Sequence, residues 1–236
     1  MNNLLNNYNI IDLTHLLEPS IATYEGTSGF RVKTVLDYDR CTGDTKFRVQ
    51  KLCLNAGIGT HIDAPNHCFS NQKSVADINL DQLIVPIYCL NMSDEANQNY
   101  YLKVDDILEF EKRYEMIKPN SLFVFYSGWS KHWPDTVKYR NQNNNGIMNF
   151  PGYTLEAANL LLKRGVAGIA IDTLSPDGSD INFPVHQAIL SSSKYIIENI
   201  ANGDKIPAIG AWAIISPLKM HSTESPVRIF ALVNKN

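Results

Sequence analysis

The chain has 236 residues, of which 44% are hydrophobic and 19% charged, and its net charge at pH 7 is −3. These values are typical of a folded protein, and the length suits a single α/β domain over residues 1–236. The slight negative charge provides no basic surface for nucleic acid, and no stretch approaches the roughly 18 apolar residues of a membrane span. We therefore expect one domain that binds neither nucleic acid nor a membrane.

The cysteines and the N-terminal residues indicate the cellular compartment of the protein. Cys41, Cys53, Cys68 and Cys89 form no Cys-x-x-Cys pair, and Cys53 and Cys89 stand in apolar runs, as small buried side chains do. Residues 1–7 lack the basic and apolar segments of a secretory signal. We therefore expect reduced thiols and a cytoplasmic protein.

The first third of the chain is predicted to be mainly strand. A short strand over residues 8–16 precedes a loop bounded by proline and glycine, and the alternating segments 29–37 and 46–55 predict a hairpin. A short amphipathic helix within 77–83 and a buried strand over 85–90 follow.

Helices and strands alternate further along the chain. A helix is predicted over 103–111 and a core strand over 121–126. The segment 154–164 has a threonine cap, a basic last turn and a following glycine, which together indicate a helix. Because the buried strand 166–171 comes directly after it, we expect a right-handed crossover and a parallel strand pair.

Residues 56–67, Ala-Gly-Ile-Gly-Thr-His-Ile-Asp-Ala-Pro-Asn-His, hold the densest cluster of reactive side chains. Glycine and proline disfavour a helix here, so we expect a strand that ends in a turn. Side chains alternate on a strand, which places His61 and Asp63 on one face and Ile62 on the other. The turn can bring His67 back toward the first face. Such a set suits a first-row metal ion, although a polar surface strand is the alternative.

Further candidates lie nearer the C-terminus. His186 follows Pro184 at the start of a short helix, where the positive helix end disfavours imidazolium and keeps the ring able to bind a metal. Glu198 interrupts the apolar strand 195–200, so it is either buried beside a cation or exposed on an edge strand. Asp172 follows a core strand, where it either serves the site or caps a turn.

Three ring-bearing residues complete the set. His15 lies alone on the first strand and is more typical of a structural histidine than of a ligand. Tyr24 stands in a Pro- and Gly-bounded loop, as a substrate-facing aromatic or as a loop anchor. Trp129 lies in an aromatic loop after the strand 121–126, where ligands of open sheets tend to bind.

The motif around His61 resembles the His-x-Gly-Thr-His-x-Asp-x-Pro-x-His signature of the cyclase family of metal-dependent hydrolases, which includes kynurenine formamidase and isatin hydrolase. Blocks similar to those of the family occur in the same order along nearly the whole chain, at residues 11–15, 128–131, 172–177, 183–186, 197–199 and 225–228. The resemblance implies a single-domain α/β fold of the swivelling β/β/α cyclase type, with a mixed β-sheet and flanking helices. It also implies a homodimer or homotetramer.

The resemblance further implies roles for individual residues. It implies one or two divalent ions, zinc or manganese, held by His61, Asp63, His186 and Glu198. By the same resemblance His67 is the proton donor and Tyr24 lines the substrate pocket. The chain departs from the family at Gly57, which stands where the first histidine ligand is expected; Asn55 on the same strand face is a weak oxygen donor.

These features predict a metal-dependent hydrolase of a small amide, N-formyl or cyclic, with N-formylkynurenine as a nameable candidate. Metal-activated water attacks the carbonyl, His67 protonates the leaving nitrogen, and Tyr24 and Trp129 stack on an aromatic substrate. Because Gly57 supplies no ligand, the alternatives are a single ion, a water in the gap, or a small-molecule binder that has lost hydrolysis. A serine hydrolase is disfavoured because no Gly-x-Ser-x-Gly elbow is present.

Overall fold

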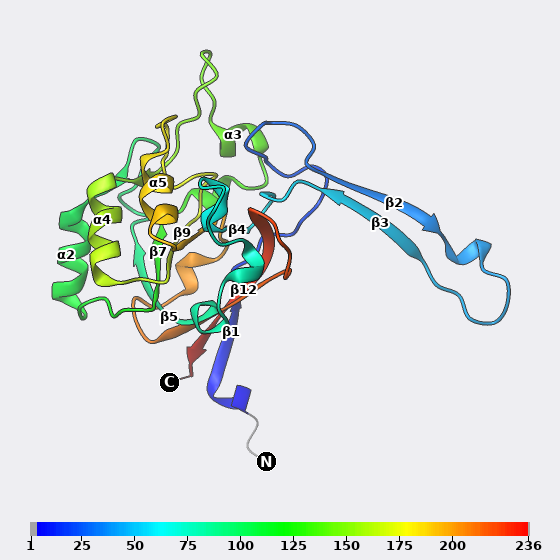
Figure 1. Ribbon diagram of the computed structural model, residues 1–236, viewed down its shortest axis with the longest axis horizontal. Coiled ribbons are helices and arrows are strands. Elements are labelled where there is room, and N and C mark those ends of the chain that lie inside the picture. The colour runs from blue at the N-terminus through cyan, green and yellow to red at the C-terminus, as the bar shows by residue number, and fades with distance from the viewer. Residues whose placement is uncertain (1–3, 236) are drawn as a thin grey trace.

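The computed structural model describes residues 4–235 (Figure 1). Residues 1–3 and residue 236 lie outside the described residues. The prediction that residues 1–7 form no secretory signal therefore falls partly outside them. Within residues 4–235, no helix combines the length and the apolar character that crossing a bilayer requires.

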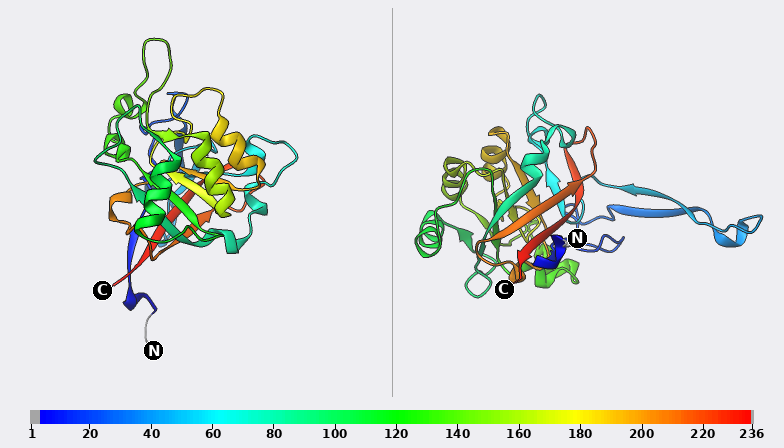
Figure 2. Two further views of the ribbon diagram at one scale, coloured as in Figure 1. Left: turned by 90° about the vertical axis from the view of Figure 1, so that its left-hand side faces the viewer. Right: turned by 90° about the horizontal axis from the view of Figure 1, so that it is seen from below.

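One mixed sheet forms the centre of the fold. Its order is β1 (Tyr8–Asp12), β12 (Glu224–Asn234), β11 (Ala211–Pro217), β5 (Ile84–Asn91), β7 (Leu122–Tyr126), β9 (Gly168–Ile171), β10 (Tyr195–Glu198) and β4 (His61–Asp63). The strands from β5 to β10 are parallel and the other pairings are antiparallel. Because β4 also pairs with β12, the sheet closes into a barrel-like ring (Figure 2). The mixed sheet expected from the sequence is confirmed.

Helices flank the parallel strands. The α-helices are α1 (Leu80–Leu83), α2 (Val104–Arg113), α3 (Thr136–Arg140), α4 (Leu155–Arg164) and α5 (Pro184–Ser191). Short 3-10 helices are η1 (Leu4–Asn7), η2 (Tyr38–Arg40), η3 (Pro65–His67), η4 (Val75–Asp77), η5 (Trp129–His132) and η6 (Gly203–Lys205). In Figure 1, α2, α4 and α5 lie side by side against β7 and β9. The predicted ends of α4 are confirmed: the Thr154 hydroxyl accepts from the Ala157 N–H, and Gly165 ends the helix at a φ of 75°.

Two apolar cores lie on opposite faces of the parallel strands. Val124 faces one core with Ile62 and Ile197, whereas Phe123 faces the other, where helix residues such as Leu161 pack. All five residues of β7 are buried, because helices cover one face of this strand and the closed sheet covers the other. The predicted parallel pair, β7 with β9, is confirmed.

A hairpin of β2 (Phe30–Leu36) and β3 (Val49–Leu54), predicted from the sequence, stands away from the body (Figure 1). Cys53 on β3 is exposed, so its predicted burial is wrong: the strand projects outward instead of entering a core. Cys89 on β5 is buried as predicted, and all four cysteines are free thiols. A short parallel pair, β6 (Tyr101–Leu102) with β8 (Gly152–Tyr153), completes the strands of residues 4–235. The homodimer or homotetramer stays a prediction.

Candidate metal centre

Strand β4 lies between two strands that come from the last quarter of the chain. Glu198 on β10 is the cross-strand partner of His61, and Glu224 on β12 is the partner of Asp63. Direct cross-strand partners project to the same face of a sheet. Four polar side chains from three neighbouring strands therefore share one face, while Ile62 is buried on the other, as the alternation predicted.

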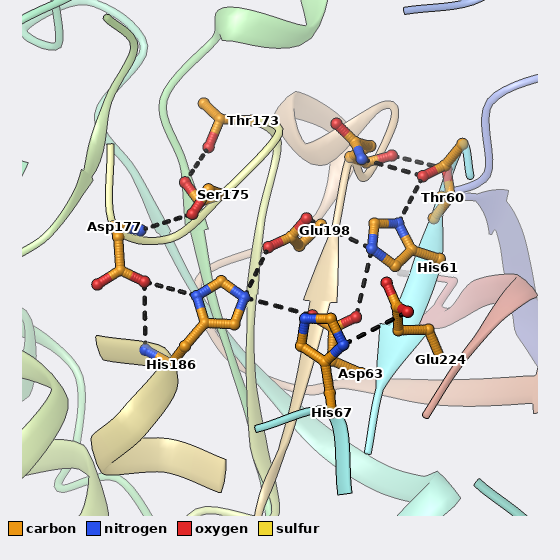
Figure 3. A network of polar contacts seen from close by, with 12 residues as sticks. Thr60, His61, Asp63, His67, Thr173, Ser175, Asp177, His186, Glu198 and Glu224 are labelled. Carbon is orange, nitrogen blue, oxygen red and sulfur yellow. Dashed lines mark hydrogen bonds and ion pairs between the residues drawn. The ribbon is translucent and has the colours of Figure 1, made fainter. Parts of the chain in front are cut away.

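His186, in the first turn of α5, adds a second imidazole to this face (Figure 3). Its Nε2 lies 3.3 Å from Oε1 of Glu198 and 3.7 Å from Oδ2 of Asp63. The Nε2 of His61 lies 3.3 Å from Oδ1 of Asp63 and 3.4 Å from Oε2 of Glu198. The four predicted ligands are thus brought together from widely separated parts of the chain.

The burial of Asp63 is the strongest sign that a cation belongs here. This side chain is only 1% exposed, and neither of its oxygens accepts a hydrogen bond from any described residue. A carboxylate taken out of water without partners is strongly destabilising unless a cation neutralises it. Burial lowers the pKa of His61, but Asp63 and Glu198 outweigh that effect and raise the pKa to about 10. The two carboxylates therefore favour a positive charge at this position.

The donor atoms fit a divalent ion. Two groups of side chains converge to within 4.8 Å: Asp63, His186 and Glu198 form one, and His61, Asp63 and Glu224 form the other. Imidazole nitrogen with carboxylate oxygen is the usual donor set for zinc and manganese in hydrolases. Because Asp63 belongs to both groups, the arrangement suits either one ion or two ions bridged by this carboxylate.

Asp177 determines how His186 is presented. Its Oδ2 lies 2.6 Å from Nδ1 of His186, and its carboxylate also accepts from the backbone N–H groups of Val185 and His186 at 2.6 and 3.2 Å. A carboxylate can only accept, so Nδ1 carries the proton and Nε2 presents its lone pair to the site. Asp177 was not among the predicted site residues, because an aspartate in a loop nine residues before His186 shows no periodic pattern that would link the two side chains.

Glu224 fills the space that a side chain at Gly57 would need. A Cβ built on Gly57 would overlap Oε1 of Glu224 and would lie 3.4 Å from Nε2 of His61. Glu224 was not among the predicted site residues, because only the pairing of β12 with β4 brings it beside Asp63. Asn55, considered there as a substitute donor, is exposed and does not line the cavity.

A cavity of about 460 Å³ opens above these residues, a size suited to a small organic molecule. Its apolar lining includes Tyr24, Phe69, Leu174 and Phe183. Tyr24 lies where predicted, with its ring centroid 6.2 Å from that of Phe183. Phe183, which the sequence analysis did not select, also packs edge-on against the ring of His186 at 5.7 Å.

Trp129 does not line this cavity, so the prediction that it stacks on the substrate is corrected. The indole is buried in a separate apolar cluster with Tyr139 and Phe150, and its Nε1–H donates to the carbonyl of Tyr139 at 2.9 Å. The physical reason is that a large ring with a satisfied N–H is more stable inside the protein than at the cavity surface.

His67 borders the cavity from η3, and one third of its side chain is exposed. Its Nδ1 lies 3.4 Å from Oε2 of Glu224, and this contact is the main reason why the pKa of His67 is raised. Its ring centroid is 5.9 Å from that of His186. The contact with Glu224 therefore favours the protonated form of an imidazole that lies beside the predicted ligands, as a proton donor requires.

His15 and Asp172 have structural roles. His15 stacks on Trp133 with ring centroids 4.1 Å apart, away from the cavity, and burial lowers its pKa to about 4. The carboxylate of Asp172 accepts from the N–H and hydroxyl of Ser127 and from the N–H of Ser130, at 2.6 to 3.0 Å. It therefore fixes the turn after β7, the structural alternative considered for it.

Comparison with known proteins identifies the family. The family described as "Putative cyclase" matches residues 11–178, more than half of the chain. The chain belongs to the cyclase family. Isatin hydrolase of Roseibium aggregatum is 28% identical over 96% of this chain and 92% of its own length. Kynurenine formamidase of Bacillus anthracis is 26% identical over 92% of this chain and 94% of its own length.

Solved structures of the cyclase family agree with the fold. An isatin hydrolase bound to the product analogue thioisatinate matches with a TM-score of 0.89 at 25% identity, over 98% of this chain and 95% of that one. Isatin hydrolase A from Ralstonia solanacearum matches with a TM-score of 0.87, also at 25% identity, over 96% of this chain and 92% of that one. The predicted cyclase-like fold and the hydrolase class of the family are confirmed.

Proposed function

We propose that this cyclase-family chain is a metal-dependent hydrolase that opens an uncharged cyclic amide fused to an aromatic ring, the chemical class that includes isatin. The observation that carries the proposal is the buried Asp63 carboxylate, which has no hydrogen-bond donor of its own and lies between two imidazoles and Glu198. The isatin hydrolases among the relatives support the choice of reaction.

The cavity lining favours a cyclic amide over N-formylkynurenine. Tyr24 and Phe183 offer ring surfaces to an aromatic substrate, and no lysine or arginine is among the described residues that line the cavity. The α-carboxylate of N-formylkynurenine would enter this space without a lysine or arginine to pair with, which is unfavourable in a partly buried site. A neutral fused lactam requires no such partner, so isatin is the first substrate to test.

The site residues divide the work of amide hydrolysis. His61, Asp63, His186 and Glu198 would hold a divalent cation, which would supply Lewis acidity and lower the pKa of water. His67 then donates its proton to the departing nitrogen as the C–N bond breaks, which leaves an amine and a carboxylate on the opened product. Tyr24 and Phe183 hold the aromatic ring and exclude bulk water from the reacting amide.

Metal content and turnover test the proposal together. Protein purified without chelator should contain stoichiometric zinc or manganese by mass spectrometry and should open isatin, followed by loss of its visible absorbance. Chelation should abolish turnover, and one of the two ions should restore it. N-formylkynurenine assayed in parallel should react more slowly. Protein that shows neither bound metal nor turnover after both ions are supplied would contradict the proposal. It would instead support the alternative, a small-molecule binder that has lost hydrolysis because Gly57 supplies no ligand.

A further inference from the structure

Two oxygens of one carboxylate face two different parts of the candidate metal centre. Oε1 of Glu224 occupies the position that a side chain on Gly57 would take, on the side of His61. Oε2 lies 3.4 Å from Nδ1 of His67 and accepts from the hydroxyl of Thr223 at 3.2 Å. Oε2 therefore contacts His67 and Thr223, whereas Oε1 lies at the Gly57 position, on the side of His61.

We propose that Glu224 is a metal ligand through Oε1 and takes the place of the side chain that Gly57 lacks. The inference rests on the proposed function, because it assumes that a cation binds at Asp63. The strand register supports it: Glu224 is the direct antiparallel partner of Asp63, so the two carboxylates project side by side. With His61 they form one of the two converging donor groups of residues 4–235.

The unpartnered oxygens of Asp63 give independent support. A third carboxylate adds negative charge beside Asp63, whose oxygens accept no hydrogen bond from the described residues, and this is unfavourable unless positive charge compensates for it. An ion between His61, Asp63 and Oε1 of Glu224 would give both carboxylates a partner. Glu224 keeps its contact with His67 at the same time, so it joins the metal to the proton donor.

A carboxylate ligand from Glu224 in place of a histidine at position 57 changes which metal ion the site prefers. A histidine at position 57 would give imidazole nitrogen, whereas Glu224 gives carboxylate oxygen. Imidazole favours zinc and carboxylate favours manganese, so the exchange shifts the relative affinities toward manganese. The backbone at Gly57 does not have a positive φ, so a side chain is permitted there once Glu224 is shortened.

The test measures dissociation constants for Mn²⁺ and Zn²⁺ by competition with a chromophoric chelator. Glu224→Ala should weaken Mn²⁺ binding about 100-fold and Glu224→Gln about 10-fold, because the amide keeps one oxygen donor. The double variant Gly57→His with Glu224→Ala should recover binding, with the affinity ratio shifted toward Zn²⁺. Glu18→Gln, the same chemical change on an exposed residue, should leave both constants unchanged.

The outcomes separate this inference from the proposed function. Wild-type protein that binds no ion at Asp63 overturns both. Wild-type protein that binds metal while Glu224→Ala binds it equally well, or a double variant with no recovery and no change in ion preference, overturns only the role of Glu224. A loss of isatin turnover with unchanged metal constants would show that Glu224 acts solely on His67. Co²⁺ absorption spectra provide a second readout: losing Oε1 should change the visible bands of the bound ion.

Discussion

Replacing Asp177 by asparagine should weaken metal binding without altering any metal ligand. The buried carboxylate accepts three hydrogen bonds, from the N–H groups of Val185 and His186 and from Nδ1 of His186. Asparagine has the same shape but only one acceptor oxygen, so its amino group must face at least one of these donors. A buried donor left unpaired costs about 1–3 kcal/mol and a charge-assisted bond about 1.5–3 kcal/mol. Because both costs apply, we expect Asp177→Asn to lower the free energy of unfolding by about 2.5–6 kcal/mol.

Metal affinity should fall in the same variant because the ring of His186 is no longer held in one tautomer. Loss of such a partner typically weakens metal binding about 10- to 100-fold. Urea unfolding of the metal-free protein measures the change in the free energy of unfolding. Competition with a chromophoric chelator measures the change in metal affinity. Asp180→Asn is the matched control, since Asp180 lies exposed in the same loop and its carboxylate accepts hydrogen bonds from Asn182. A folded Asp177→Asn protein with wild-type metal affinity would refute the reasoning.

Two further predictions concern different parts of the chain. Glu111→Gln should cost about 1–2 kcal/mol of stability at pH 7, because Arg164 donates two hydrogen bonds to Glu111 at 2.7 and 2.8 Å and lowers its pKa. Since the folded pKa lies below the unfolded value, this contribution is complete above about pH 4.3 and is lost as the pH falls through the folded pKa. Urea midpoints of the two proteins should therefore converge as the pH falls through the folded pKa of Glu111, and a constant difference would contradict the ion pair. His67→Gln should lower kcat for isatin about 100- to 10,000-fold with metal content unchanged, and near-normal turnover would exclude His67 as the proton donor.

Local sequence patterns predicted those structural features that depend only on residues close together in the chain. The threonine cap and terminal glycine of α4 act within one helical turn, and the alternation of β4 places His61 and Asp63 on one face regardless of the rest of the fold. Glu198 was a candidate because a carboxylate in an apolar strand requires a partner. These inferences depend on neighbours along the chain, which the sequence displays directly.

Contacts between distant segments were decided only by the tertiary structure. β11 and β12 were not among the predicted elements, yet β12 closes the sheet against β4 and brings Glu224 beside Asp63, 161 positions earlier in the numbering. Trp129 looked suited to a ligand loop but is buried against Tyr139. Local periodicity carries no information about which strands pair or which way a loop side chain turns.

The sequence by itself determined that His61 and Asp63 share a face and that the Glu198 carboxylate in an apolar strand requires a partner, and its resemblance to the cyclase family showed that Gly57 stands where a histidine ligand is expected. Only the closed sheet places Glu224 in the space beside Gly57 and next to Asp63, because strand register and loop packing depend on the whole chain at once. A buried carboxylate without a donor becomes visible only when every neighbour is in place.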